Sequence, residues 1–231
     1  MLLIGAPRRP EIDQYTIKFL IGAFALTLPF IELALTRGSI SSISASFWIA
    51  DPDVWPRIIF VGFLFVISAF LLAYNGLSET EMWLAKVACA SALGVALFPC
   101  SCDDTAREII GGVHLASATA LFIVLAWFCV IFMRRAKAKG HRQARWRTAI
   151  YMICGWGMVA SAALFIARAI TKQEALAFWG ETVGLISFGT SWLTASRVLP
   201  VITLPSERQP LVVATSRRTT PDPGAPERAA D

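Results

Sequence analysis

Long apolar segments recur along the chain and are separated by short polar connections. A helix rises about 1.5 Å per residue, so about 20 apolar residues cross the hydrocarbon core of a membrane. Six segments approach or exceed this length: 14–35, 57–75, 82–99, 109–133, 148–170 and 175–198. The run LFIVLAWFCVIFM (121–133) does not alternate apolar and polar residues as a membrane β-barrel strand does. The pattern predicts an all-α bundle of six transmembrane helices.

The composition supports a membrane protein, since 56% of the 231 residues are hydrophobic and only 16% are charged. A soluble domain of this size needs more polar surface. We expect an N-terminal segment (1–13), a transmembrane domain (14–198) and a disordered tail (199–231) with several prolines and few aromatic residues. The Ser-rich stretch 36–56 contains two Trp residues and is typical of a loop at the membrane interface, which can include a short helix.

Basic residues cluster between the fourth and fifth segments. Residues 134–147 contain seven Lys or Arg and no acid, whereas 99–108 contain three acids and only Arg107. Since Lys and Arg favour the cytoplasmic side, we expect this loop and both termini to face the cytoplasm from an inner membrane. The loop would then contact anionic lipid headgroups. Topology accounts for the net charge of +5, so we expect no nucleic-acid partner.

Five polar side chains within the helices fall in the outer third of the membrane, on the side opposite the basic loop. Polar groups are costly in hydrocarbon, so each is a candidate ligand-binding residue. They are Glu32, Arg57, His114, Arg168 and Glu181. Two interpretations remain open: one polar pocket that faces the periplasm, or two ion pairs, Glu32–Arg57 and Arg168–Glu181. Lys18 and Lys86 lie near inner helix ends, where their ammonium groups can reach water.

The sequence offers few other reactive groups. A hydrolase could use Ser44 with His114, although no Gly-x-Ser-x-Gly motif occurs. We expect no metal and no cofactor, because the chain has only two histidines and neither has a paired ligand along its helix. Cys100 and Cys102 flank Ser101 in the outer loop, and we leave open whether they form a disulfide.

Short motifs across about residues 40–195 together resemble a known family. They are Ile43-Ser44-Ala45, Arg57 with Phe60-Val61-Gly62, Gly94–Pro99, His114 with Ser117-Ala118, Ile153–Trp156, Phe178–Glu181 and Phe188–Trp192. The chain resembles bacterial multi-pass membrane proteins of the domain-of-unknown-function 998 family, which implies six inner-membrane helices and no established reaction. The family pattern has Asp directly after the arginine, where this chain has Ile58, so an Arg–Asp site would be incomplete here.

A more distant similarity, to membrane hydrolases that act on lipid amides, covers Ser44 and His114 but lacks their paired histidines in the last helix. We therefore expect a bundle that binds a small or lipid-derived ligand in its periplasmic pocket, or that assembles with another membrane protein or a second copy. The alternative is an intramembrane hydrolase acting on a lipid-like substrate, and whether the chain is an enzyme stays open.

Overall fold

The computed structural model describes residues 12–49, 54–101 and 108–208, and this part of the chain is all-helical, without strands. It contains the six predicted helices. They are α1 (Gln14–Leu35), α2 (Trp55–Ala73), α3 (Glu79–Leu97), α4 (Glu108–Lys137), α5 (Arg142–Thr171) and α6 (Ala175–Ala195). Five of them are long and apolar enough to cross a membrane, and α6 is the exception. This is the architecture of a multi-pass membrane protein.

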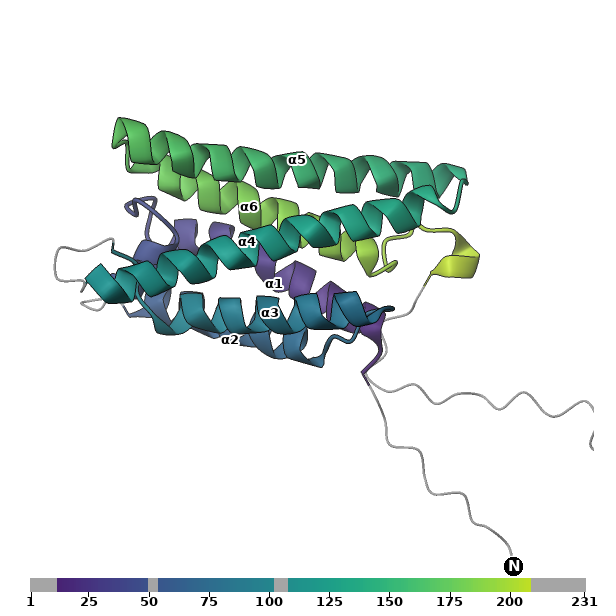
Figure 1. The fold of residues 1–231 in the computed structure, drawn as a ribbon, viewed down its shortest axis with the longest axis horizontal. Coiled ribbons are helices and arrows are strands. Elements are labelled where there is room, and N and C mark those ends of the chain that lie inside the picture. Colours follow the sequence, from purple (N-terminus) through teal and green to yellow (C-terminus); the bar gives the residue numbers. More distant parts are fainter. Residues whose placement is uncertain (1–11, 50–53, 102–107, 209–231) are drawn as a thin grey trace, which may run out of the picture.

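The six helices form a closed ring. The helices lie lengthwise along one axis (Figure 1). Each helix packs against its neighbours in sequence, and α1 also packs against α6, which closes the ring. Short connections make sequence neighbours antiparallel. The start of α1, the end of α6 and the α2–α3 and α4–α5 connections therefore lie at one end of the bundle.

Aromatic side chains fill the middle of the ring. Trp192 of α6 is fully buried and lies 5.1 Å, between ring centroids, from both Tyr74 and Phe128, in edge-to-face geometry. Phe132 packs against the same Trp192 ring at 5.7 Å. Edge-to-face pairs are favourable beyond their buried area, so this cluster holds α4 and α6 together across the ring.

The backbones of α1 and α6 approach closely where the helices cross at Gly22 and Gly189. A Cβ atom added at Gly22 would lie 2.7 Å from the Leu193 backbone nitrogen, and one added at Gly189 would lie 2.7 Å from that of Leu26. Small residues at such crossings let two membrane helices approach closely.

The lower apolarity of α6 follows from its position in the ring. Thr182, Gly184, Ser187 and Ser191 are all buried against neighbouring helices rather than exposed on the outer surface. The outer surface of the bundle instead presents large apolar side chains, such as Trp156 of α5, which is 69% exposed. Contact with lipid therefore requires apolar side chains on α5 far more than on α6.

The helix bounds differ most from prediction at the basic segment 134–147, which is not a loop. Helix α4 continues to Lys137 and α5 begins at Arg142, so the connection is only four residues long. Arg and Lys are good helix formers, and charge does not stop a helix beyond the hydrocarbon. Both helices have 30 residues, or about 45 Å, and extend past the apolar layer.

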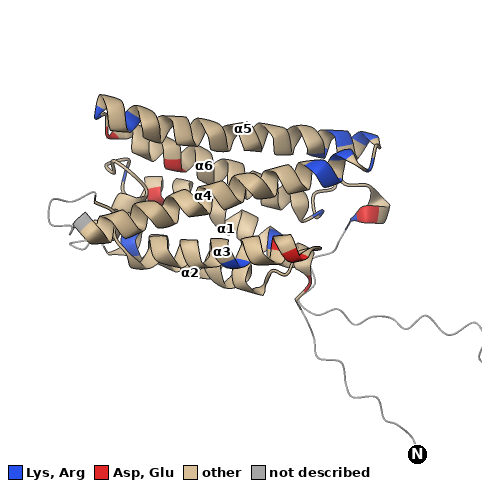
Figure 2. Ribbon diagram, viewed as in Figure 1, with Lys and Arg blue, Asp and Glu red and all other residues tan. Residues whose placement is uncertain are grey.

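The charges are distributed unevenly between the two ends of the bundle. All described Lys and Arg residues lie at or near the end where α1 begins, except Arg37, Arg57, Arg168 and Lys172 (Figure 2). We call this the basic end and the other the opposite end. The segment 199–208, predicted as part of a disordered tail, folds against the basic end and contains a short 3-10 helix, η2 (Pro205–Glu207).

Candidate functional site

A short segment bridges several helices at the opposite end. We call residues Ile43–Trp48, which include the 3-10 helix η1 (Ser44–Trp48), the strap. The strap forms side-chain hydrogen bonds to α1 and α6, and its Trp48 Nε1 donates to the carbonyl oxygen of Cys100, just after α3, at 3.0 Å. The predicted interfacial stretch 36–56 therefore contains a structured cover over one end of the ring.

The two predicted acids bind this strap. Glu32 of α1 is fully buried and accepts a hydrogen bond from Ser46 Oγ at 2.7 Å, while its Oε1 has no partner among the described residues. Glu181 of α6 accepts from Ser44 Oγ at 2.5 Å and from the backbone nitrogens of Ile43 and Ser44. Both acids thus position the strap through hydrogen bonds to their carboxyl oxygens.

The other three predicted site residues have separate partners. Arg57 Nε donates to the Phe47 carbonyl oxygen of the strap. Arg168 pairs with Glu174 at 2.5 Å on the exposed surface, and His114 Nδ1 lies 2.7 Å from the carbonyl oxygen of Phe98. Neither ion pair considered from the sequence, Glu32–Arg57 or Arg168–Glu181, is among the salt bridges of the described residues. Three of the five residues meet at the strap and two lie elsewhere.

The candidate hydrolytic pair does not assemble. Ser44 is engaged with Glu181, and a carbonyl oxygen can only accept, so His114 donates its Nδ1 proton to Phe98. Cys100 is disulfide-bonded, and Cys102 lies outside the described residues. Within the described ranges, no group of three or more His, Cys, Asp and Glu side chains is arranged to hold a metal ion.

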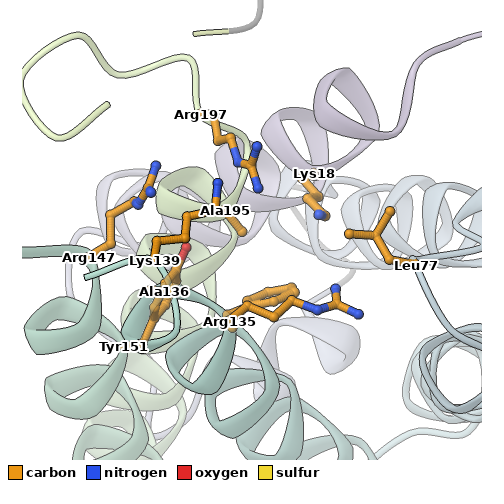
Figure 3. Close-up of a pocket in the computed structure, with 10 residues that line it drawn as sticks. Lys18, Leu77, Arg135, Ala136, Lys139, Arg147, Tyr151, Ala195 and Arg197 are labelled. Atoms are coloured by element: carbon orange, nitrogen blue, oxygen red, sulfur yellow. The ribbon is translucent and has the colours of Figure 1, made fainter. Parts of the chain in front are cut away.

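A polar cavity lies instead at the basic end, inside the ring. It has a volume of about 40 Å³, which is room for about three water molecules or one small anionic group. Five cationic side chains line it: Lys18, Arg135, Lys139, Arg147 and Arg197. Figure 3 shows these side chains around one space, coming from α1, from α4 and its C-terminal connection, from α5 and from the segment after α6. Tyr151 and Phe132 form part of its wall.

Two of these cations are deeply buried. Lys18 is only 5% exposed, so the prediction that its ammonium group reaches water is wrong. Its ammonium nitrogen lies 5.3–5.4 Å from the ring centroids of Tyr15, Tyr74 and Phe132. No ion pair or hydrogen bond of this ammonium is found within the described ranges. Arg147 is 3% exposed, and its Nη1 has no hydrogen-bond partner there either.

Glu81 is an acid that lies beside the cavity and binds Arg135, one of the lining cations. This fully buried carboxylate forms a salt bridge with Arg135 and accepts a hydrogen bond from the Tyr74 hydroxyl at 2.9 Å. Burial and the adjacent Glu81 raise the pKa of Tyr74 above its usual value, so its hydroxyl stays protonated and donates. Ser78 caps α3 at the Glu81 backbone nitrogen, which fixes the carboxylate in the first turn of the helix.

Glu207 of η2 is the second acid at the cavity. Its carboxylate binds Lys139 through Oε1 and Arg147 Nη2 through Oε2, the latter at 2.8 Å, and His141 Nε2 lies 3.5 Å away. Partial burial acts to raise the pKa of Glu207, but the hydrogen bonds from Lys139 and Arg147 outweigh it and lower the pKa to about 2. Two carboxylates therefore face five cations, and the cavity retains an excess of positive charge.

A second cavity, of about 30 Å³, lies between α2, α4 and α6, and the described residues in its wall include no polar side chain. Leu64, Leu121, Phe122 and Phe188 are among its lining residues. None of the five residues predicted as a periplasmic pocket lines either cavity.

Two features of the sequence indicate the cationic cavity. Lys18 stands in register with Ile21, Ala25 and Leu28, the buried stripe of α1, which places its side chain on the inner face. Ser78 and Glu81 form a capping-box pattern. The folding back of Glu207 onto α5 carries no comparable local signal.

Comparisons with protein-family models, curated proteins and solved structures give no match for this chain. The resemblance to the domain-of-unknown-function 998 family therefore stays a prediction.

Proposed function

We propose that this chain is an inner-membrane protein, with both termini in the cytoplasm, that binds a phosphate-bearing anionic ligand in the cationic cavity. The observation that carries the proposal is the Lys18 ammonium, buried in the ring and without an ion pair or hydrogen bond within the described ranges. A buried charge is costly unless it is paired. An anion in the adjacent cavity would supply the missing partner.

A phosphate group matches the donors around the cavity. It has several acceptor oxygens, and Arg binds such oxygens through two parallel N–H donors while Lys acts as a compact charge. Arg147 has a free Nη1 for this purpose, and Arg197 has no ion pair within the described ranges; its guanidinium lies 5.0 Å from the Tyr15 ring centroid. The excess of cations over carboxylates suits a ligand with one or two negative charges.

The phosphate can belong to a lipid headgroup or to a small soluble compound. The proposed topology favours contact with lipids, because the cytoplasmic leaflet carries the anionic lipids that attract basic segments. A periplasmic ligand pocket has less support, since Glu32 and Glu181 already bind the strap.

The test measures ligand-dependent thermal stability of the purified protein in neutral detergent. Phosphatidic acid, phosphatidylglycerol, phosphatidylcholine and inorganic phosphate are added in separate series. We expect the two anionic lipids to raise the unfolding temperature, because a ligand at 100 times its Kd stabilises by about 2.7 kcal/mol. Phosphatidylcholine, which has no net charge, should have little effect.

Two lysine variants locate the effect. Lys18→Met should abolish the shift, whereas Lys86→Met should retain it, because Lys86 donates to the backbone carbonyls of Leu72 and Tyr74 and does not line the cavity. A response to inorganic phosphate as well as to lipid would indicate a soluble phosphate compound. No shift with any anion, or equal shifts in both variants, would refute the proposal.

A further inference from the structure

The C-terminal 3-10 helix η2 brings an acid of the chain itself to the cationic cavity. In Figure 1, η2 lies beside the α4–α5 connection at the basic end. Its Glu207 carboxylate bridges Lys139 and Arg147, two of the five cations that line the cavity. A carboxylate shares with phosphate the negative charge and the paired acceptor oxygens that Arg and Lys recognise.

The segment that carries Glu207 is anchored, although the surface around it is polar. Thr203 is 2% exposed, whereas Pro205 and Ser206 are exposed. The left-handed backbone of Arg197, with a φ of 56°, lies just after α6 and before this segment returns along the basic end. Glu207 is thus held on the cations by a short, folded connection.

Glu207 satisfies the cations only in part. It engages Arg147 through Nη2 and leaves the buried Nη1 without a hydrogen bond, and it makes no ion pair with Lys18 or Arg197. The carboxylate therefore holds the side of the cavity formed by Lys139 and Arg147, while Lys18 has no ion pair within the described ranges.

We infer that Glu207 is a built-in competitor of the ligand: it occupies part of the anion site, and an incoming phosphate group displaces it from Lys139 and Arg147. This inference rests on the proposed function and adds its regulation. In the free protein η2 closes the site, and in the bound protein the segment 199–208 is released. Ligand binding would then be read out as a movement of the C-terminal segment on the proposed cytoplasmic face.

The first experiment compares affinities for phosphatidic acid in dodecyl maltoside micelles, measured from ligand-dependent unfolding temperatures. Glu207→Gln removes the competing charge, so we expect about tenfold tighter binding, which corresponds to about 1.4 kcal/mol. Glu174→Gln is the matched control, because it breaks an acid–arginine pair of the same kind at the opposite end of the bundle. Its affinity should equal that of the unmodified protein.

The second experiment follows the segment directly. Spin labels at Ser206→Cys and Lys137→Cys report the distance between η2 and the end of α4; both sites are exposed, and Cys89, Cys129 and Cys154 are buried. We expect the distance to increase on addition of phosphatidic acid and to remain unchanged with phosphatidylcholine.

The outcomes separate this inference from the proposed function. Equal affinity in Glu207→Gln and the unmodified protein, with no movement of the label, would refute the competitor and leave anion binding intact. Weaker binding in Glu207→Gln would also refute it, because Glu207 would then support the site. Absence of binding in both proteins would refute both proposals.

Discussion

Lys18 places an ammonium group in the interior of the ring, 5.3–5.4 Å from the centroids of three aromatic rings. Cation–π contacts recover part of the desolvation cost, typically about 0.5–2 kcal/mol. A buried cation without an ion pair still lowers stability relative to an apolar side chain of similar length. Functional sites often contain residues that lower the stability of the free protein. Lys18 fits this description if a ligand in the cavity supplies the interaction that it lacks.

This argument predicts a trade-off at Lys18. Replacement by Met should raise the unfolding temperature of the ligand-free protein by about 2–4 °C, corresponding to about 1 kcal/mol, because the unpaired charge is removed. The thermal unfolding of both proteins in detergent without added lipid checks the direction. A lower unfolding temperature in Lys18→Met would show that the ammonium stabilises the free protein, and therefore that Lys18 needs no bound anion.

Glu207 gives a prediction for pH. Its pKa falls from 4.5 to about 2 in the folded chain, so its bonds to Lys139 and Arg147 stabilise the docked segment above pH 4.5. That contribution is lost as the pH falls from 4.5 toward 2, when the carboxylate becomes protonated. The spin-label distance from η2 to α4 should stay constant down to about pH 4.5 and increase below it. A distance that changes between pH 7 and 5 would contradict this assignment.

At the scale of elements, the contact between α1 and α6 depends on two glycines. Gly22→Ala and Gly189→Ala should each destabilise the bundle by about 1–3 kcal/mol, because the added Cβ would meet backbone atoms that cannot move aside. Gly62→Ala is the control, since no atom lies within 4 Å of the position that its Cβ would take on α2, and Ala favours the helix. Denaturation in detergent measures the stability of the three variants. Equal stabilities would show that α1 and α6 leave room for a Cβ atom at their crossing.

The strap is the second element whose attachment can be tested. Ser46→Ala should destabilise the protein by about 1.5–3 kcal/mol, because it removes the hydrogen bond to the fully buried Glu32 carboxylate. Hydrogen exchange of Ile43–Trp48 should accelerate at the same time. Ser39→Ala removes a hydroxyl that donates to the Thr36 carbonyl oxygen nearby and should leave strap exchange unchanged. Unaltered exchange in Ser46→Ala would show that the other contacts of the strap, with Glu181, Arg57 and Cys100, hold it without Glu32.

The elements differ in how far the sequence could predict them. The helices follow from apolar length, which the membrane imposes on each span separately. The ends of α4 and α5 do not, because the basic residues outside the hydrocarbon are equally compatible with helix and loop. The sequence predicts the strap as an interfacial loop that can include a short helix, but not its contacts, since the Ser and backbone groups that bind Glu32 and Glu181 have no characteristic spacing.

At the scale of the whole molecule, the ring explains why buried polar residues were easier to find than their partners. Glu32 and Glu181 are conspicuous because acids are rare in apolar segments. Their partners, and the return of Glu207 to Arg147, depend on which helix faces are brought together around the ring, and this is a long-range property. The cationic cavity is likewise assembled from α1, α4, α5 and the segment after α6, so no single stretch of sequence contains it.

The orientation of the ring in the membrane decides which leaflet meets the cavity. All described Lys and Arg residues lie at or near the basic end except Arg37, Arg57, Arg168 and Lys172, so the positive-inside rule predicts that this end is cytoplasmic. Single cysteines at exposed positions test it with a membrane-impermeant maleimide. Ser39→Cys and Lys172→Cys, at the opposite end, should be labelled in intact cells, and Arg142→Cys only after permeabilisation. Labelling of Arg142→Cys alone in intact cells would place the cavity outside, away from the anionic lipids of the cytoplasmic leaflet, and would leave a soluble phosphate compound as the ligand to pursue.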